Sequence, residues 1–539
     1  MKSNRQSQSA ETEGEASRSY FSVAKPLRDH DGNDDVHSVD ETAMDRRVNR
    51  KLDIALLPLL SLLYLFNGLD RGNVGNAQTQ GPEAGFTNDI GAAPDDLNLA
   101  VSLFFITFVL FQPPSAAVGR WLGAKHWIPI MMLGWGFVTI CQAFIRGRGS
   151  LIATRLLIGA FEAGFYPTAV AYLSFFYCRY DLAVRVGLFY GQYAVAGAFS
   201  GAIAYGVFHL RDGPLKNWQY LFIIEGTLTI LFGLIAWVFL PAGPGSAWFL
   251  THEERRFAAD RIKADSVSFT EHAYDAHGVE TDRLTQRDFM ETLRDWKFWY
   301  VLVFNICASV PGQAFSVFLP LVVQGLGYSS IQANLMSVPP YACGALGLYL
   351  FTLSSDYRKE RGYHILGGIV IAVVGLVATV TVESNGGKYA ALCVLLLGSY
   401  VAAPLTVAWL SGNTPGKQLE MARGLDASGV SENIADFPHI EPGKRSLILG
   451  LNGFGNLSGV IGAQLYRDHY KPGYKIPFYV TLGFVAVSLL GYLSYRLTLA
   501  AVNRRKLEIM RQKTADEIER ERLDNTRYAD KKWTFIYGL

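Results

Sequence analysis

Two charged residues interrupt an apolar segment that is long enough to cross a membrane. The segment reads LIATRLLIGAFEAGFYPTAV (151–170) and contains Arg155 and Glu162. A charge at the centre of a membrane helix costs about 2.5–3.5 kcal/mol even on the lenient insertion scale. Ionisable residues kept at that cost are candidates for a substrate or ion site, although a structural pair bridged by other helices, or a snorkelling arginine, would use the same residue types.

The spacing of the two charges favours a shared site over a direct ion pair. Arg155 and Glu162 are seven residues apart, so they lie on nearly the same face of a helix, about 10 Å apart along its axis. Gly159 lies between them on that face and leaves a lane without a side chain. We therefore expect Arg155 and Glu162 to form two polar ends of a cavity wall.

The first apolar span ends in a second charged motif, YLFNGLDRGNVGNA (64–77). Asp70 and Arg71 are adjacent and therefore point about 100° apart, so we expect one to face the cavity and the other a neighbouring helix. Asn73 follows on the same stretch. The alternative is that these residues form only the polar outer end of the span.

Further polar residues lie inside the expected spans and could line the same cavity: Gln192, Glu225, Asn305, Gln313 and Trp409. Two of the spans also contain helix-disturbing motifs, SVPGQ (309–313) and SVPPYACG (337–344). Broken helices at membrane depth are tolerated where they line a cavity. Ordinary kinks and interhelical hydrogen bonds explain each of these residues, taken singly, equally well.

The sequence shows no pattern for enzymatic chemistry. It has no Walker A loop, no Gly-x-Ser-x-Gly, no HExxH, and its five cysteines are scattered without metal-ligand spacing. We therefore expect no catalytic residue, no metal, no cofactor and no nucleic-acid partner. Without a nucleotide site, any concentrative work must draw on an ion gradient.

The elements that position these residues are apolar helices. The chain is 50% hydrophobic and 18% charged, whereas soluble domains are about 25% charged. With about 20 residues per crossing, the sequence predicts an all-α membrane protein of about twelve spans in two groups of six, near 54–76, 97–118, 126–146, 151–177, 184–208, 218–240, 298–323, 331–354, 364–383, 388–411, 446–466 and 477–502.

Five segments follow from this pattern. We expect a disordered N-terminal tail (1–50), a first six-helix bundle (51–240), a central loop (241–297), a second bundle (298–502) and a C-terminal tail (503–539). No cleavable signal peptide is visible. Lys and Arg are concentrated in the tails and in alternate loops, which puts both termini and the central loop in the cytoplasm.

The two halves also echo each other. The small-residue stretches 191–208 and 453–466 occupy the fifth span of each half and share a Ser-Gly step, Ser200-Gly201 and Ser458-Gly459. Their equivalent positions favour a parallel duplication of a six-helix bundle.

Several motifs resemble those of the major facilitator superfamily, and within it the fungal allantoate-permease family of anion:cation symporters, which includes nicotinate, pantothenate and biotin carriers. The motifs are DRGNVGNA (70–77), RLLIGAFEAGFYP (155–167), WQYLFIIEG (218–226) and LPAGPGSAWFLTHEE (240–254). The resemblance covers roughly residues 45–505. It implies an alternating-access fold with the substrate held between the two bundles.

The resemblance also implies roles for individual residues. Arg155 falls on the family's anion-holding arginine and Glu162 on its proton-coupling acid, while Asp70 and Arg71 fall on the charged pair of the first span. The stretch SSDYRKERG (354–362) resembles the superfamily's gating loop, with Asp356 and Arg361 as its charged members. We assign Arg71, Asn73, Gln192, Asn305, Gln313 and Trp409 to substrate binding with Arg155, and Asp70 and Glu225 to proton coupling with Glu162.

The chain departs from the family between the tenth and eleventh spans. A polar insert (414–445) stands there in place of a short loop, and it is either a true cytoplasmic loop or retained intron sequence.

These observations lead to one main hypothesis and two alternatives. The first is a monomeric, plasma-membrane symporter that imports a small organic anion, such as allantoate, nicotinate or pantothenate, together with protons. The alternatives are a proton-coupled drug or metabolite antiporter and a nutrient-sensing receptor that resembles a transporter.

Overall fold

The computed structural model describes residues 34–80, 86–210, 213–267, 286–358, 360–413, 452–471, 473–523 and 531–539. These residues form helices and connections, with no β-strand among them, as the all-α prediction requires. Within these ranges, nine helical segments are long and apolar enough to cross a membrane. The three other expected spans fall on the helices α5, α8 and, for its described part, η4 with α19.

The first group of helices corresponds to the first six expected spans. It consists of α2 (Asp34–Gln78), α4 (Pro94–Leu122), α5 (Ala124–Gln142), α6 (Gly147–Glu162), α7 (Phe165–Ser174), α8 (Arg179–Val207) and α9 (Asn217–Phe239), with the short α3 (Phe86–Asp89) before α4. The start of α4 shows why a helix begins there. Pro94 occupies the first turn, where its missing N–H is not needed, and the Asp96 carboxylate accepts a hydrogen bond from the Ala93 N–H at 3.0 Å.

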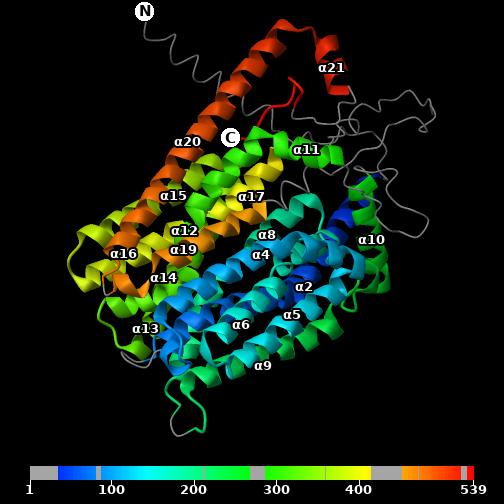
Figure 1. Cartoon of the computed structure of the whole chain (residues 1–539). Helices are drawn as coiled ribbons and strands as arrows, with labels where there is room; N and C mark the ends of the chain where they lie inside the picture. The colour runs from blue at the N-terminus through cyan, green and yellow to red at the C-terminus, as the bar shows by residue number, and fades with distance from the viewer. Residues whose placement is uncertain are drawn as a thin grey trace, which may run out of the picture. The chain divides into compact units, whose positions relative to one another are not determined.

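The second group corresponds to the last six expected spans. It consists of α12 (Trp296–Gly325), α13 (Ser330–Met336), α14 (Val338–Arg358), α15 (Gly362–Thr381), α16 (Asn385–Ser399), α17 (Ala402–Gly412), η4 (Asn452–Leu457), α19 (Ser458–Leu465) and α20 (Lys475–Gln512). Figure 1 shows the two groups by colour, blue to teal for α4, α5, α6, α8 and α9, and green to red for the second group.

The helix breaks follow the sequence only in part. The double proline separates α13 from α14 as expected, with the break at Ser337 and both prolines in the first turn of α14. The expected break at Pro311 is wrong, because α12 continues through it as one helix. A break that we did not expect, between α6 and α7, follows directly after Glu162.

The two groups contact each other through equivalent pairs of helices. In one pair, α8 of the first group packs against α13 and α14 of the second, and in the other, α19 packs against α4. The Ser-Gly steps lie at these contacts: a side chain at Gly201 would overlap the carbonyl oxygen of Asn334, and one at Gly459 would overlap the Phe105 ring. This exchange of partners is what a duplicated six-helix unit predicts.

The remaining segments lie outside the two groups. The chain divides into two compact units, Met1–Arg47 and Val48–Leu539, and both groups belong to the second unit except for the start of α2. Helix α2 already begins at Asp34, earlier than a disordered tail over 1–50 allows, whereas residues 1–33 and the insert 414–445 lie outside the described residues.

The central loop and the C-terminal tail also contain short helices. They are η1 (Pro244–Ser246), α10 (His252–Val267), α11 (Gln286–Arg294) and α21 (Ala515–Leu523), while η5 (Asp468–Tyr470) lies between α19 and α20. Helix α10 is joined to α2 by an ion pair between Lys51 and Glu254 (2.7 Å) and by a hydrogen bond from Arg261 to Asn49 (3.0 Å).

Candidate functional site: a buried charge cluster in the first group

The adjacent Asp70 and Arg71 of α2 point in different directions, as their spacing predicts. The Asp70 carboxylate accepts hydrogen bonds from the Trp135 indole (3.1 Å) and the Thr229 hydroxyl (2.8 Å), which belong to α5 and α9. The Arg71 guanidinium instead points towards α6 and α8. Asp70 therefore faces neighbouring helices of its own group.

Arg71 and Glu162 form a buried ion pair. Nε and Nη2 of Arg71 donate to the same carboxylate oxygen of Glu162 at 3.3 and 3.0 Å, and the two side chains are only 5% and 0% exposed. The other Glu162 oxygen has no hydrogen-bond partner among the described residues. Four aromatic rings surround the guanidinium with centroids 4.7–5.9 Å away, namely Phe104, Phe105, Phe108 and Tyr193. Such cation–π contacts partly replace the water that the buried charge has lost.

Arg155 is the second buried cation of the cluster, and it forms no ion pair within the described residues. Its Nη2 donates to the side-chain oxygen of Gln142 at 3.2 Å, and its Nε has no hydrogen-bond partner there. The acids that interact with its charge are Glu162 and Asp70. Arg155 thus retains unused hydrogen-bonding capacity in a fully enclosed position.

The expected lane between Arg155 and Glu162 is absent, and this prediction is wrong. A side chain at Gly159 would overlap the Thr107 hydroxyl and the carbonyl oxygen of Phe104. Gly159 is therefore needed because α4 packs closely against α6, and α4 occupies the space between the two charges.

Glu225 of α9 is the least compensated charge of the cluster. It is fully buried, and neither of its carboxylate oxygens has a hydrogen-bond partner within the described ranges. Its polar neighbours are Asp70 and Asn73, and the Asn73 side chain likewise makes no hydrogen bond there. Two neighbouring buried carboxyl groups cannot readily both be ionised in such surroundings, so one of Asp70 and Glu225 is suited to hold a proton.

Tyr193 connects the charge cluster to the second group of helices. Its hydroxyl lies 3.4 Å from Nη1 of Arg71 and 3.4 Å from the side-chain oxygen of Gln313. Gln313 in turn donates to the Asn456 side chain in η4 at 3.0 Å. A line of polar contacts thus leads from Glu162 through Arg71 across the boundary between the groups.

Two more of the predicted residues lie along the same boundary or near η4. Gln192 donates to the Tyr349 hydroxyl of α14 at 3.3 Å. Asn305 is buried in α12, and its amide faces Gly455 of η4 so closely that a side chain at Gly455 would contact it.

The structure separates the remaining predicted residues from the charge cluster. Asp356 and Arg361 form an ion pair at the connection between α14 and α15. The Trp409 indole donates to the main-chain oxygen of Gly538 at 2.7 Å, so its polar atom is engaged by the end of the chain. In the part of the chain that the structure describes, no group of three or more His, Cys, Asp or Glu residues is arranged to hold a metal ion.

Sequence reasoning missed several partners in the cluster. They are Trp135, Thr229, Gln142, Tyr193 and Asn456. Gln142 could have been found, because it is an amide near the end of an apolar span, and Tyr193 directly follows the predicted Gln192. Trp135 and Thr229 gave no signal, since both residue types are common in membrane helices.

Comparisons with known proteins agree on one family. The sequence model of the Major Facilitator Superfamily matches residues 60–431. The chain is 33% identical to the MFS-type transporter efuF of Hormonema carpetanum, over 87% of this chain and 88% of the relative. It is 30% identical to the high-affinity nicotinic acid transporter of Saccharomyces cerevisiae, over 83% and 76% of the two chains.

A solved structure supports the fold. A bacterial homologue of the human lysosomal transporter Spinster superposes with a TM-score of 0.55 at 15% identity, covering 81% of this chain and 95% of the homologue. At that identity the likeness concerns the fold alone.

Proposed function

The chain belongs to the Major Facilitator Superfamily, and on this premise we propose that it is a symporter that moves a small organic anion together with a proton. The family establishes that the chain is a multi-pass membrane transporter of a small-molecule substrate and not an enzyme. The anion, the proton coupling, a monomeric state, the plasma membrane and the cytoplasmic termini belong to the proposal.

The observation that carries the proposal is the buried Arg71–Glu162 pair at the boundary between the two groups. Arg71 is the cation that reaches towards the second group, through Tyr193 and Gln313. A guanidinium can bind a carboxylate with two parallel N–H donors, and at present one Glu162 oxygen occupies two of these donors. An incoming carboxylate can therefore compete with Glu162 for Arg71.

This competition couples the anion to the proton. When the substrate takes over Arg71, Glu162 remains buried without its cation, and an isolated buried carboxylate neutralises itself by binding a proton. The loaded site then holds Arg71, the anion and a neutral Glu162, which has the same net charge as the empty site. Neither state carries an uncompensated charge through the change of access.

The other residues of the cluster support these two. Arg155, fixed by Gln142, adds a second positive charge to the cluster and offers the anion an Nε donor that has no partner among the described residues. One of the neighbouring acids Asp70 and Glu225 holds a proton that can be passed on to Glu162. Asn73 lies beside this pair, and Gln192, Asn305 and Gln313 are the proposed uncharged contacts of the substrate.

The test is uptake into a transporter-deficient yeast that expresses the chain, with radiolabelled carboxylate vitamins, ureides and small peptides as probes. We expect at least one monocarboxylate, with nicotinate as the first probe, to accumulate faster at acidic than at neutral external pH. A protonophore should abolish the accumulation. Stimulated efflux instead of uptake would favour an antiporter, and binding without turnover in proteoliposomes would favour a sensor; either result would refute symport.

A further inference from the structure

The last residues of the chain are held by two asparagine side chains. Asn503 of α20 donates to the main-chain oxygen of Tyr537 (2.8 Å) and accepts from its N–H (2.9 Å). Asn413, directly after α17, does the same with Gly538, at 2.9 and 2.7 Å. An asparagine amide offers both a donor and an acceptor, so it can pair with both polar groups of one residue. The asparagines thus bind two successive residues, Tyr537 and Gly538, through main-chain groups alone.

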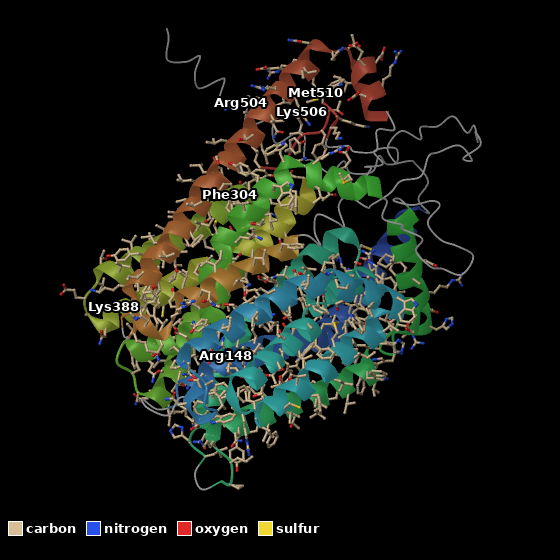
Figure 2. All side chains as sticks on the ribbon, viewed as in Figure 1. Arg148, Phe304, Lys388, Arg504, Lys506 and Met510 are labelled. Atoms are coloured by element: carbon tan, nitrogen blue, oxygen red, sulfur yellow. The ribbon has the colours of Figure 1, made fainter. Side chains whose placement is uncertain are left out.

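Other side chains complete this binding site. The Trp409 indole adds a third hydrogen bond to Gly538, at its main-chain oxygen. The Tyr537 ring lies between two ammonium groups, with Lys297 4.8 Å and Lys506 4.5 Å from its centre. Lys506 also donates to the main-chain oxygens of Lys532 (2.8 Å) and Phe535 (3.0 Å). Figure 2 labels Lys506 towards the end of α20 that leads to α21.

The side chains of this site are built into the fold. Asn413, Asn503 and Trp409 are 2%, 7% and 3% exposed. Trp409 lies in α17, Asn413 directly follows α17, Asn503 lies in α20, and Lys297 lies in the first turn of α12. Trp409 packs against Tyr495 of α20 with ring centroids 4.9 Å apart. The site therefore joins three helices of the second group at one end.

The bound segment, residues 531–539, also contacts the connection between α14 and α15. The main-chain oxygen of Leu539 accepts from the N–H of Arg361 at 3.3 Å, and the Arg361 side chain pairs with Asp356. The end of the segment thus binds the main chain of Arg361, whose side chain forms the ion pair with Asp356.

We propose that Asn413, Asn503 and Trp409 form a peptide-binding site, here called the asparagine clamp, whose ligand is the chain's own segment 531–539. By holding this segment against Arg361, the clamp positions the Asp356–Arg361 ion pair. The site recognises main-chain groups at positions 537 and 538 and an aromatic ring at position 537. It depends on neither the substrate nor the proton coupling proposed above.

Two substitutions of Gly538 differ in whether they keep its hydrogen bond to Asn413. The N–H of Gly538 is a donor to Asn413, so Gly538→Pro removes a bond and Gly538→Ala keeps it. A Cβ atom at this position would lie 3.5 Å from the Asn413 side-chain oxygen, which is ordinary contact. The alanine variant is therefore the matched control for the proline variant.

Hydrogen–deuterium exchange of the full-length protein in detergent tests the proposal. In the unaltered chain we expect slow exchange at the amides of Tyr537 and Arg361. Asn413→Ala should speed exchange at the Tyr537 amide by about tenfold or more. The Tyr537 amide is bound by Asn503 and not by Asn413, so this effect is expected only if the segment detaches as a unit. Gly538→Pro and Asn503→Ala should speed exchange at Arg361 by a similar factor.

The controls are Gly538→Ala and Arg504→Ala, the latter an exposed residue next to Asn503. Both should leave these amides as slow as in the unaltered chain, and exchange in α5 should be the same in all variants. If Asn413→Ala frees only the Gly538 amide, the two asparagines do not act as one clamp and the proposal is wrong. If the segment detaches while Arg361 stays protected, the positioning role is wrong.

Discussion

Glu162 accepts two hydrogen bonds from Arg71, at 3.3 and 3.0 Å, and none from Arg155, with which it shares a face of α6. The acid is therefore compensated by a different helix from its own. Because Arg71 also reaches Tyr193 and, through it, Gln313, the state of Glu162 is linked to the boundary between the two groups.

Glu162→Gln separates proton coupling from substrate exchange. Glutamine is neutral, so Arg71 becomes available to the anion at all times and no proton is needed to release it. We expect loss of pH-driven accumulation, with exchange of labelled for unlabelled substrate retained in proteoliposomes. Glu162→Asp, which keeps the charge, is the matched control and should retain part of the accumulation. Undiminished proton-driven accumulation by Glu162→Gln would reject the role of this acid.

Replacement of Arg155 tests the second cation of the cluster. Arg155→Ala removes a buried charge and the donor to the Gln142 side-chain oxygen, whereas Arg155→Lys keeps the charge but loses the planar fork and the Nε donor. We expect both variants to abolish uptake while the protein still reaches the membrane surface, measured by surface labelling beside transport. Normal transport by Arg155→Ala would exclude Arg155 from the anion site.

Glu225→Gln should stabilise the protein rather than weaken it. The Glu225 carboxyl lies fully buried with no hydrogen-bond partner among the described residues, next to the Asp70 carboxyl. A neutral side chain of the same shape removes the cost of charge in this place, which is of order 1–3 kcal/mol. The check is the thermal unfolding midpoint in detergent, which should rise at neutral pH while proton-driven uptake falls. A lower midpoint would mean that the carboxylate is compensated after all.

The individual charges could be predicted from the sequence, whereas their pairing could not. Arg155, Glu162, Asp70 and Glu225 stand out because ionisable residues are rare in apolar runs. The partner of Glu162, however, lies 91 positions away on α2, and only the fold brings the two side chains together. The roles of these residues remain predictions.

Gly159 and Trp409 show that contacts with neighbouring segments cannot be predicted from the sequence of one helix. A glycine between two charges predicts open space when its helix is considered alone, but a glycine also permits a neighbouring helix to approach, and here α4 does so. Trp409 is expected to line the cavity because it lies inside an apolar span, and in the structure its indole bonds the main chain of Gly538; its part in substrate binding stays a prediction. No periodicity in the sequence marks that contact.

The attachment of α10 to α2 should weaken in acid. Burial, the largest influence on Glu254, would by itself raise its pKa, but hydrogen bonds from Lys51 and Thr251 outweigh burial and lower the pKa below its usual value. A group whose folded pKa is lowered contributes stability above its unfolded pKa of about 4.3, and that stability is lost as pH falls through the folded pKa. Because Lys51 is half-exposed, the contribution is below about 1 kcal/mol.

The measurement is limited proteolysis of α10 as a function of pH. Cleavage should increase as the pH falls below about 4.3, and Glu254→Gln should show increased cleavage already at neutral pH. Glu253→Gln, an exposed neighbour on the same helix turn, is the control and should behave as the unaltered chain does. Equal cleavage of Glu254→Gln and the unaltered chain at neutral pH would show that this ion pair does not hold α10.

Gly201→Leu should disturb the contact between α8 and the second group. Even a Cβ atom at Gly201 would overlap the main-chain oxygen of Asn334, close to where Asn334 donates to Thr79 at 2.8 Å. The two groups therefore cannot approach each other at this end, and we expect loss of transport through a shifted balance between the two access states. Gly206→Leu, on the same helix with open space around it, is the control. A single cysteine at Thr79, probed with a membrane-impermeant maleimide, should react faster in Gly201→Leu than in Gly206→Leu; equal rates would mean that this contact does not close the end of the protein.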